Sequence, residues 1–301
     1  MTTTYDETRA VPAATRTAHP VLASTRAELL RLRKWPAVWI TGGAWLFMAM
    51  MFGYLFNYLS YTSGDTNFSN EGETSASLLA QLMPAYVPNV LIQGTPMFGG
   101  ALMMVLGALV AGSGYGWGTW KTIFTQGPSR TSVALGSLLG LTAVVVTLVA
   151  VTLAMCFAAS LGIAAIESQS VVWPSFSDLA QGTGAALGVL EMWALFGFLL
   201  GTLARGPALS VGLGLVWSLV IENLLRGVGT LLSWVDAFTH VLPGTAAGSL
   251  VGSIVGIQPG GDSTPGVVDT LSATQATLTL LAYVVIVPAI ALFLIRRRDV
   301  A

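Results

Sequence analysis

Six long apolar stretches, separated by shorter and more polar segments, dominate the pattern along the chain. They run from about Ala37 to Leu59, Gly94 to Ser113, Val133 to Ala158, Thr183 to Ala204, Ala208 to Leu224 and Ala276 to Ile295. A helix needs about 20 mainly apolar residues to cross the hydrocarbon core of a bilayer. The pattern therefore predicts an all-α integral membrane protein with six transmembrane helices.

The composition agrees with this prediction. Only 9% of the 301 residues are charged and the mean hydropathy is +0.74, whereas soluble domains carry about 25% charged residues. The net charge of −1 creates no basic field, so we expect no nucleic-acid partner. The single cysteine, Cys156, lies in an apolar stretch, and the two histidines are far apart. We therefore expect neither a disulfide nor a metal site.

Basic residues are distributed unequally between the two sides that six spans define. Twelve of the 13 fall on one side and only Arg226 falls on the other, which also carries eight of the 14 acidic residues. Cytoplasmic segments of membrane proteins retain positive charge, so we expect both termini in the cytoplasm of a bacterial-type plasma (inner) membrane. Residues 1–20 lack the apolar core of a signal peptide and are predicted as a disordered cytoplasmic tail, with 21–301 forming one six-helix domain.

A basic, amphipathic helix is predicted just before the first span. Thr25 and Glu28 have the spacing of a capping box, with Thr25 as N-cap, and Pro36 separates the helix from the span. Leu22, Leu29, Leu32 and Trp35 fall roughly on one face. We expect the helix to lie along the inner leaflet of the bilayer, and a simple positive anchor for the first span is compatible with that role. Its charged residues are Arg26, Glu28, Arg31, Arg33 and Lys34.

The stretch GYGWGTWKTIFTQGPSRT, from Gly114 to Thr131, joins the second and third spans. Trp117, Trp120, Ile123 and Phe124 are spaced to share one face of a short helix, with Thr119 as candidate N-cap. Such a face needs lipid headgroups or a partner protein to cover it, although a plain connector on the membrane surface is an alternative. A phosphate-binding loop is disfavoured, because no Walker pattern and no preceding strand are present.

Residues Gly118 to Arg130 resemble the first cytoplasmic loop of ABC exporter permeases, of the type-two ABC transport permease superfamily. RAELLRLRKWPA (Arg26–Ala37) and RRRD (Arg296–Asp299) are similar to that family's first helix and C-terminus, so the resemblance covers nearly the whole chain. The family usually carries an acidic residue, in the form Glu-Tyr, just before the loop. Here Gly114 stands before Tyr115 instead, so the loop lacks this charge.

The resemblance implies the permease subunit of an ATP-driven exporter, which moves a hydrophobic or amphipathic substrate outward. The loop would be a coupling helix that docks on a separate ABC ATP-binding subunit, and a second permease, identical or related, would complete a dimer. This chain would be no enzyme and hold no cofactor, because its cytoplasmic segments are too short for an ATPase; ATP and Mg²⁺ would bind the partner. The docking residues would be Gly118, Thr119, Trp120, Lys121, Thr122, Ile123, Phe124, Gly127, Pro128, Ser129 and Arg130.

Two glutamates lie within the predicted spans. Glu191, in the fourth span, has no basic residue within one helical turn. A carboxylate inside the membrane marks either a substrate or coupling pathway or a hydrogen-bonded packing contact, and both interpretations stay open. Glu222 and Arg226, four residues apart at the outer end of the fifth span, are predicted to form a local ion pair. A proton-coupled secondary transporter that uses Glu191, and a non-transporting scaffold or sensor, are the alternative functions.

Glycines spaced four residues apart predict close contacts between helices. They are the sets Gly136/Gly140, Gly184/Gly188, Gly197/Gly201 and Gly248/Gly252/Gly256. The last set lies in an apolar segment, residues 244–257, that is too short to cross the bilayer. We predict that it forms a re-entrant segment in the outer leaflet, before the last span. The loop of about residues 60–93 is acidic and polar and shows no catalytic motif.

Overall fold

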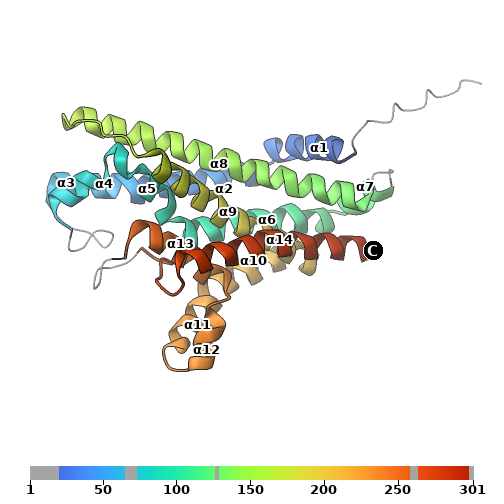
Figure 1. Cartoon of the computed structure of the whole chain (residues 1–301). Helices are drawn as coiled ribbons and strands as arrows, with labels where there is room; N and C mark the ends of the chain where they lie inside the picture. Colours follow the sequence, from blue (N-terminus) through green and yellow to red (C-terminus); the bar gives the residue numbers. More distant parts are fainter. Residues whose placement is uncertain (1–19, 65–72, 126–128, 258–263, 298–301) are drawn as a thin grey trace, which may run out of the picture.

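The computed structural model is an elongated bundle of helices (Figure 1). It describes residues 20–64, 73–125, 129–257 and 264–297, and every regular element in these ranges is a helix. The all-α prediction is therefore confirmed for the described chain. The tail up to residue 19, Gly127 and Pro128, and the chain after Arg297 lie outside the described residues.

Within the described ranges, six helices are long and apolar enough to cross a membrane, and each overlaps one of the predicted stretches. They are referred to as spans 1 to 6. Span 1 comprises α2 (Pro36–Met50), η1 (Met51–Leu55) and α3 (Phe56–Ser63); span 2 comprises η3 (Thr95–Gly99) and α6 (Gly100–Gly116); span 3 is α8 (Arg130–Ile166); span 4 is α9 (Phe176–Ala204); span 5 comprises α10 (Pro207–Leu215), η4 (Val216–Ile221) and α11 (Glu222–Gly229); and span 6 is α14 (Ala273–Arg297).

The other helices are short. They are α1 (Pro20–Lys34), α4 (Ser75–Gln81), η2 (Pro84–Tyr86), α5 (Val87–Gln93), α7 (Thr119–Thr125), α12 (Ser233–Thr239) and α13 (Pro243–Val255). Helices α1 and α7 lie where the sequence predicts short helices, before span 1 and between spans 2 and 3. They lie at the end of the bundle where α14 finishes, which we call the α7 end (Figure 1).

Helix α8 continues well beyond the predicted end of span 3 near residue 158. Its 37 residues make it about 55 Å long at 1.5 Å per residue. The extra turns are held by polar contacts with span 1: the Tyr54 hydroxyl lies 3.0 Å from Oγ of Ser160, and Tyr58 and Tyr61 donate to Glu167 at 2.9 and 3.2 Å. These bonds fix the end of α8 that reaches beyond the predicted span.

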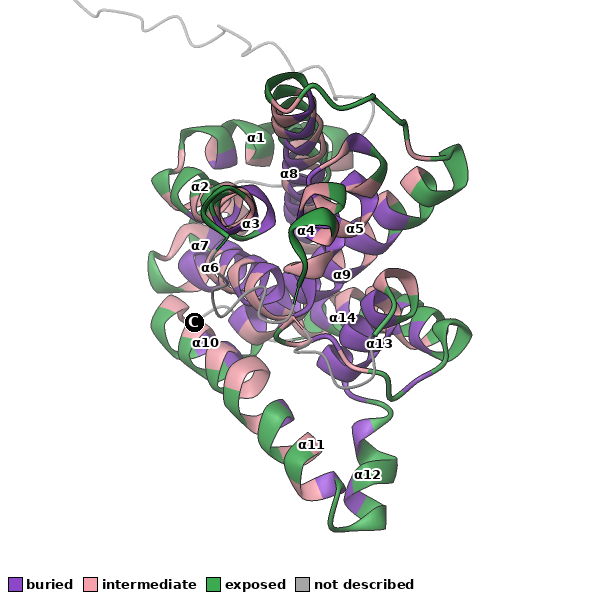
Figure 2. Cartoon of the chain, turned by 90° about the vertical axis from the view of Figure 1, so that its left-hand side faces the viewer, coloured by how far each residue is buried: buried purple, intermediate pink, exposed green. Residues whose placement is uncertain are grey.

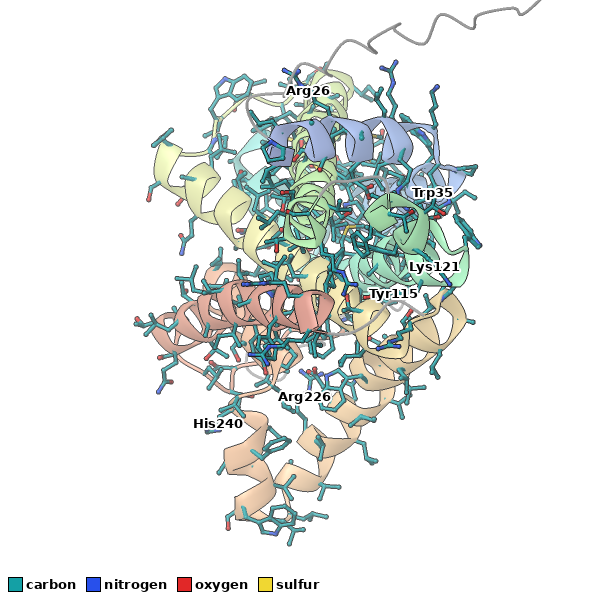
Figure 3. All side chains as sticks on the ribbon, turned by 90° about the vertical axis from the view of Figure 1, so that its right-hand side faces the viewer. Arg26, Trp35, Tyr115, Lys121, Arg226 and His240 are labelled. Carbon is teal, nitrogen blue, oxygen red and sulfur yellow. The ribbon has the colours of Figure 1, made fainter. Side chains whose placement is uncertain are left out.

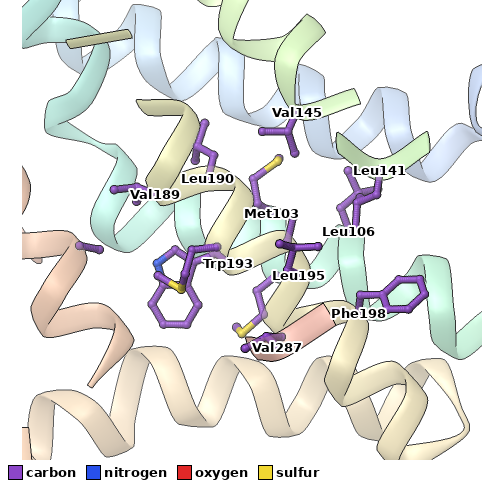
Figure 4. Close-up of a cluster of buried hydrophobic side chains, with 14 of the residues drawn as sticks. Met103, Leu106, Leu141, Val145, Val189, Leu190, Trp193, Leu195, Phe198 and Val287 are labelled. Atoms are coloured by element: carbon purple, nitrogen blue, oxygen red, sulfur yellow. The ribbon is translucent and has the colours of Figure 1, made fainter. Parts of the chain in front are cut away.

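Spans 2 and 4 form the centre of the bundle. Their most apolar windows are 72% and 67% buried, against 17–39% for the other four spans. Figure 2 shows this inner layer from the end opposite α7, and Figure 4 shows side chains of its core, including Met103, Leu106, Trp193 and Phe198. The remaining spans are mostly uncovered, as expected where the surroundings are lipid rather than water.

The glycine prediction of close contacts between helices is confirmed for two of the four sets, Gly136/Gly140 and Gly197/Gly201. A Cβ at Gly197 would lie 2.0 Å from the backbone oxygen of Met104 in α6, so spans 2 and 4 touch backbone to backbone. Gly136 and Gly140 approach α1, where an added Cβ would lie 2.6 and 2.8 Å from the nearest atom. Gly248 and Gly252 instead approach the backbone of residues 266 and 268, which belong to no helix, and nothing lies within 4 Å of a Cβ at Gly256. The prediction is wrong for Gly184 and Gly188, where nothing lies within 4 Å of an added Cβ.

Two bent pairs of short helices complete the bundle at the end opposite α7. Residues Ser75–Gln81 and Pro84–Gln93 meet at 69°, and Ser233–Thr239 and Pro243–Val255 meet at 74°. The second pair contains the segment predicted as re-entrant, and its α13 is largely buried. The first pair corrects the prediction of a polar loop, because Val87, Leu91 and Ile92 of α5 are buried against the bundle.

Candidate functional site

Basic residues gather at the α7 end of the bundle. Of the ten that the structure describes, nine lie there, on α1, on α7 and at the adjoining ends of spans 3, 4 and 6; only Arg226 lies elsewhere. Figure 3 looks onto this end, with Arg26, Trp35, Tyr115 and Lys121 labelled. The charge asymmetry read from the sequence is therefore also an asymmetry of the folded bundle.

Helix α7 is anchored to span 2 through Trp120. The indole is only 4% exposed, and its Nε1 donates to the backbone oxygen of Ala111 at 3.3 Å. The ring stacks on Tyr115 at a centroid distance of 5.8 Å and contacts Phe124 at 5.3 Å. The apolar side of α7 that the sequence assigned to lipid or a partner is thus covered by the chain itself, and half-buried Ile123 and Phe124 pack on the same core.

The opposite face of α7 is exposed. It carries Lys121, Thr122 and Thr125, together with Trp117 just before the helix, which is 66% exposed. Lys121 and Thr125 are four residues apart, so they project from one side of the helix. We call these four residues the α7 outer face; Thr125 is absent from the docking residues that the resemblance implies.

The flanks of α7 are shaped by backbone and cap residues. Gly118, not Thr119, stands in the N-cap position: its φ is +65°, which favours glycine, and its carbonyl accepts from the amide of Thr122 at 3.2 Å. Ser129 caps α8 by accepting a bond from the Ser132 amide at 3.1 Å. The guanidinium of Arg130 lies 5.6 Å from the Phe124 ring centroid.

Helix α1 packs on span 3 at the two glycines of α8. A Cβ at Gly136 would meet Ser24 at 2.6 Å, and one at Gly140 would meet Glu28 at 2.8 Å. The predicted N-cap at Thr25 is wrong, because the helix already covers Pro20–Lys34 and Thr25 donates to the carbonyl of Val21 inside it.

The predicted leucine face of α1 is also divided by the structure. Leu32 is buried, whereas Leu22 and Leu29 are exposed. At 3.6 residues per turn, Leu29 and Leu22 lie about 60° and 80° round the helix from Leu32, and this is enough to leave both exposed. The exposed side also carries Leu30 and three cations. Those cations are Arg26, Arg33 and Lys34.

Arg31 ties α1 to the anchor of α7. Its guanidinium bonds Glu28 at 2.5 Å and approaches the carbonyl of Val110 in α6 at 3.4 Å. It also lies 5.3 Å from the ring of Trp35, which in turn makes an edge contact with Trp117 at 6.0 Å. Arginine thereby joins α1, span 2 and the start of α7 into one unit, a link that no sequence pattern signals.

The space between these helices is too small for a nucleotide. A cavity of about 30 Å³ lies between Glu28, Arg31 and Trp120, enough for one or two water molecules. Among the residues that the structure describes, no group of three or more His, Cys, Asp or Glu could hold a metal ion. What this end of the molecule offers is therefore a surface rather than a chemical cavity.

Glu191 lies between spans 3 and 4. Its Oε1 accepts from the hydroxyl of Thr142 in α8 at 2.6 Å, and its Oε2 is buried without a hydrogen-bond partner among the described residues. The structure thus places one carboxylate oxygen in a packing contact and leaves the other free for a proton or for water. Both interpretations of this residue stay open.

The predicted ion pair between Glu222 and Arg226 is not formed. Glu222 is fully buried and accepts from Nε1 of Trp217 at 2.8 Å, while Arg226 donates to Asn223 at 2.7 Å. The i, i+4 spacing favours contact on an isolated helix, but here the carboxylate points into the bundle and the guanidinium bonds along the helix surface.

Neither the comparison with protein-family models nor that with curated proteins finds a match to this chain. The assignment of a function therefore rests on its own residues and their geometry.

Proposed function

We propose that this chain is the permease subunit of an ATP-driven ABC exporter that moves a hydrophobic or amphipathic substrate out of the cell or the bilayer. A separate ATP-binding subunit would bind ATP and Mg²⁺ and dock at the α7 end, which would face the cytoplasm of a bacterial-type plasma membrane. A second permease, identical or related, would complete the dimer. The sequence resemblance to type-two ABC permeases and the geometry of α7 support this proposal.

The observation that carries the proposal is that α7 is fixed on one side and exposed on the other. Trp120 attaches it to the end of span 2, the most buried span, and Arg31 and Trp35 attach α1 to the same point. A force applied to the α7 outer face would therefore move span 2 rather than bend a loose loop. A plain surface connector needs no such anchor.

The α7 outer face defines what the partner would contact. It offers one cation, Lys121, one large ring, Trp117, and the hydroxyls of Thr122 and Thr125. A matching groove on the partner would have an acidic residue opposite Lys121 and an apolar surface opposite Trp117. The glycine at position 114, where the family usually has an acidic residue, leaves Lys121 as the main charge of this contact.

The test is co-purification of the ATP-binding subunit with the tagged chain in mild detergent, identified by mass spectrometry. The docking variant is Lys121→Glu plus Thr125→Glu, because both side chains are exposed and the bond that Thr125 donates, to the carbonyl of Thr122, stays within α7. The matched control is Gln169→Glu plus Ser170→Glu, which adds two charges at exposed positions of the opposite end. Trp120→Asp or Phe124→Asp would not serve, because they would break the anchor inside the chain.

We expect the native chain and the control to retain an ATP-binding subunit and the docking variant to lose at least about 90% of it, as for a loss of about 1.4 kcal/mol or more in binding free energy. Recovery of no ATP-binding subunit with the native chain would overturn the proposal. If the partner is recovered but ATP-dependent substrate flux is absent, the chain is a scaffold or sensor.

The second candidate function is a proton-coupled transporter. The specific observation in its favour is the buried, unpartnered Oε2 of Glu191, because an intramembrane carboxylate can carry a proton. It predicts flux that persists without any ATP-binding subunit and is abolished by Glu191→Gln. Under the ABC proposal, flux requires the partner whatever residue stands at this position.

A further inference from the structure

The second half of span 5, which is α11, diverges from the bundle, and one buried residue, Glu222, stands where it begins to diverge. The span is the least buried of the six, and α11 with α12 projects from the bundle in Figures 1 and 2. Over residues 215–228, all of them described, Glu222 alone is buried. A fully buried carboxylate on a nearly uncovered helix needs a specific partner.

That partner is the first turn of α13. Oε2 of Glu222 lies so close to Gly244 that a Cβ there would be 2.1 Å from it, and the ring of Trp193 in span 4 would be 3.4 Å from the same Cβ. The backbone amide of Gly244 interacts with the carboxylate. The hydroxyl of Tyr283 in span 6 donates to the carbonyl of Val241, in the turn between α12 and α13, at 2.8 Å.

The contact is a helix cap supplied from another element. Helix α13 begins at Pro243, and its N-cap residue, Leu242, has no side chain that can accept from the first-turn amides. These amides and the helix dipole favour a negative charge at this end. Arg226 adds a second positive charge nearby, so the carboxylate is compensated within the chain and the position is a structural contact rather than an ion-binding site.

The cap is built to release. Among the described residues, Oε2 makes no hydrogen bond of full geometry, and the bond that Oε1 accepts comes from Trp217 on the same span. Directly before Glu222 lies η4, a π-helical turn of six residues without a buried side chain. Such turns are local irregularities at which helices bend.

We propose that Glu222 is a catch that holds the outer half of span 5 against α13, and that η4 is the hinge on which this half swings away when the catch opens. The device lies in this chain alone, so it does not depend on the export function. If that function is correct, the catch controls how the bundle opens at the end opposite α7.

The first experiment measures opening through the reactivity of a thiol. Thr245, beside Gly244, is fully buried and its hydroxyl has no partner among the described residues, so Thr245→Cys in a Cys156→Ala background places a reporter at the contact. With Glu222→Ala, N-ethylmaleimide should label it about tenfold faster, as expected for the loss of a helix cap. Native Cys156, buried in span 3, should keep its slow labelling when Glu222→Ala is made in the native chain.

The second experiment uses the fit between Glu222 and glycine. Gly244→Ala should raise labelling of the reporter in the same way, because its Cβ would displace the carboxylate. Gly227→Ala is the control: it lies on span 5, as Glu222 does, and nothing lies within 4 Å of a Cβ there, so labelling should not change. Unchanged labelling in both Glu222→Ala and Gly244→Ala would overturn the proposal. A parallel rise at Cys156 would also overturn it, because the whole bundle would then be loosened. Neither result depends on recovering an ATP-binding subunit, so the two proposals fail separately.

Discussion

At the scale of single residues, the bundle depends on places where a side chain would not fit. Gly197 in span 4 and Gly107 in span 2 each face the backbone oxygen of the opposite helix, at 2.0 and 1.9 Å from an added Cβ. A flexible side chain could move aside, but a helix backbone in a packed core cannot move without its neighbours. The contact between spans 2 and 4 is therefore set by the absence of one carbon atom.

Gly197→Ala should accordingly destabilise the protein. We expect a loss of about 2 kcal/mol in unfolding free energy, the range for overpacking a core, seen as a fall of about 5 °C in the apparent unfolding temperature of the detergent-purified chain. Gly188→Ala is the matched control in the same helix, where an added Cβ meets nothing. It should be neutral or slightly stabilising, because alanine is the better helix former. Equal effects of the two changes would contradict the contact.

At the scale of elements, the buried side of α7 determines its stability. Trp120→Ala would remove a ring that is 4% exposed and its bond to Ala111, which should free α7 from span 2. We expect trypsin to cleave the purified chain after Lys121 at least about tenfold faster, because cleavage requires local unfolding. Trp117→Ala is the control: that ring is 66% exposed and loses only an edge contact with Trp35. Equal cleavage in both variants would show that Trp120 is no anchor.

The spans and the existence of α1 and α7 could be predicted from the sequence, because apolar length and helical periodicity are local properties. What the apolar face of α7 packs against could not be predicted from the sequence. Trp120, Ile123 and Phe124 require cover, but a sequence does not show whether lipid, a partner or the chain's own span 2 supplies it. The burial of Glu222 was missed for the same reason, since its partner, Gly244, is distant in sequence.

Helix α5 could have been predicted from the sequence, although its pattern of apolar residues is weaker than that of the spans. Val87, Val90 and Leu91 have the i, i+3, i+4 spacing of an apolar helix face and are all buried, but acidic and polar neighbours lower the average over the loop. Thr25 shows the opposite error. A capping-box spacing occurs by chance within a helix, and Thr25 there simply bonds back to Val21.

At the scale of the whole molecule, the two ends of the bundle differ in charge. Of the ten described basic residues, nine lie at the α7 end, while the described carboxylates outside the spans, apart from Glu28, lie at the other. Basic segments resist transfer across a membrane and acidic ones contribute little. We therefore expect the α7 end to stay in the cytoplasm, which is where the proposed docking surface for a cytoplasmic partner would have to lie.

This orientation can be measured with a membrane-impermeant thiol reagent on intact cells. In a Cys156→Ala background, Gln169→Cys places a thiol between spans 3 and 4, and Thr122→Cys places one on the α7 outer face; both positions are exposed in the bundle. We expect the reagent to label position 169 on intact cells and position 122 only after the membrane is permeabilised, because only the first lies on the acidic side. Labelling of position 122 on intact cells would invert the topology. It would also exclude α7 as the docking site of an ATP-binding subunit, since ATP is held in the cytoplasm.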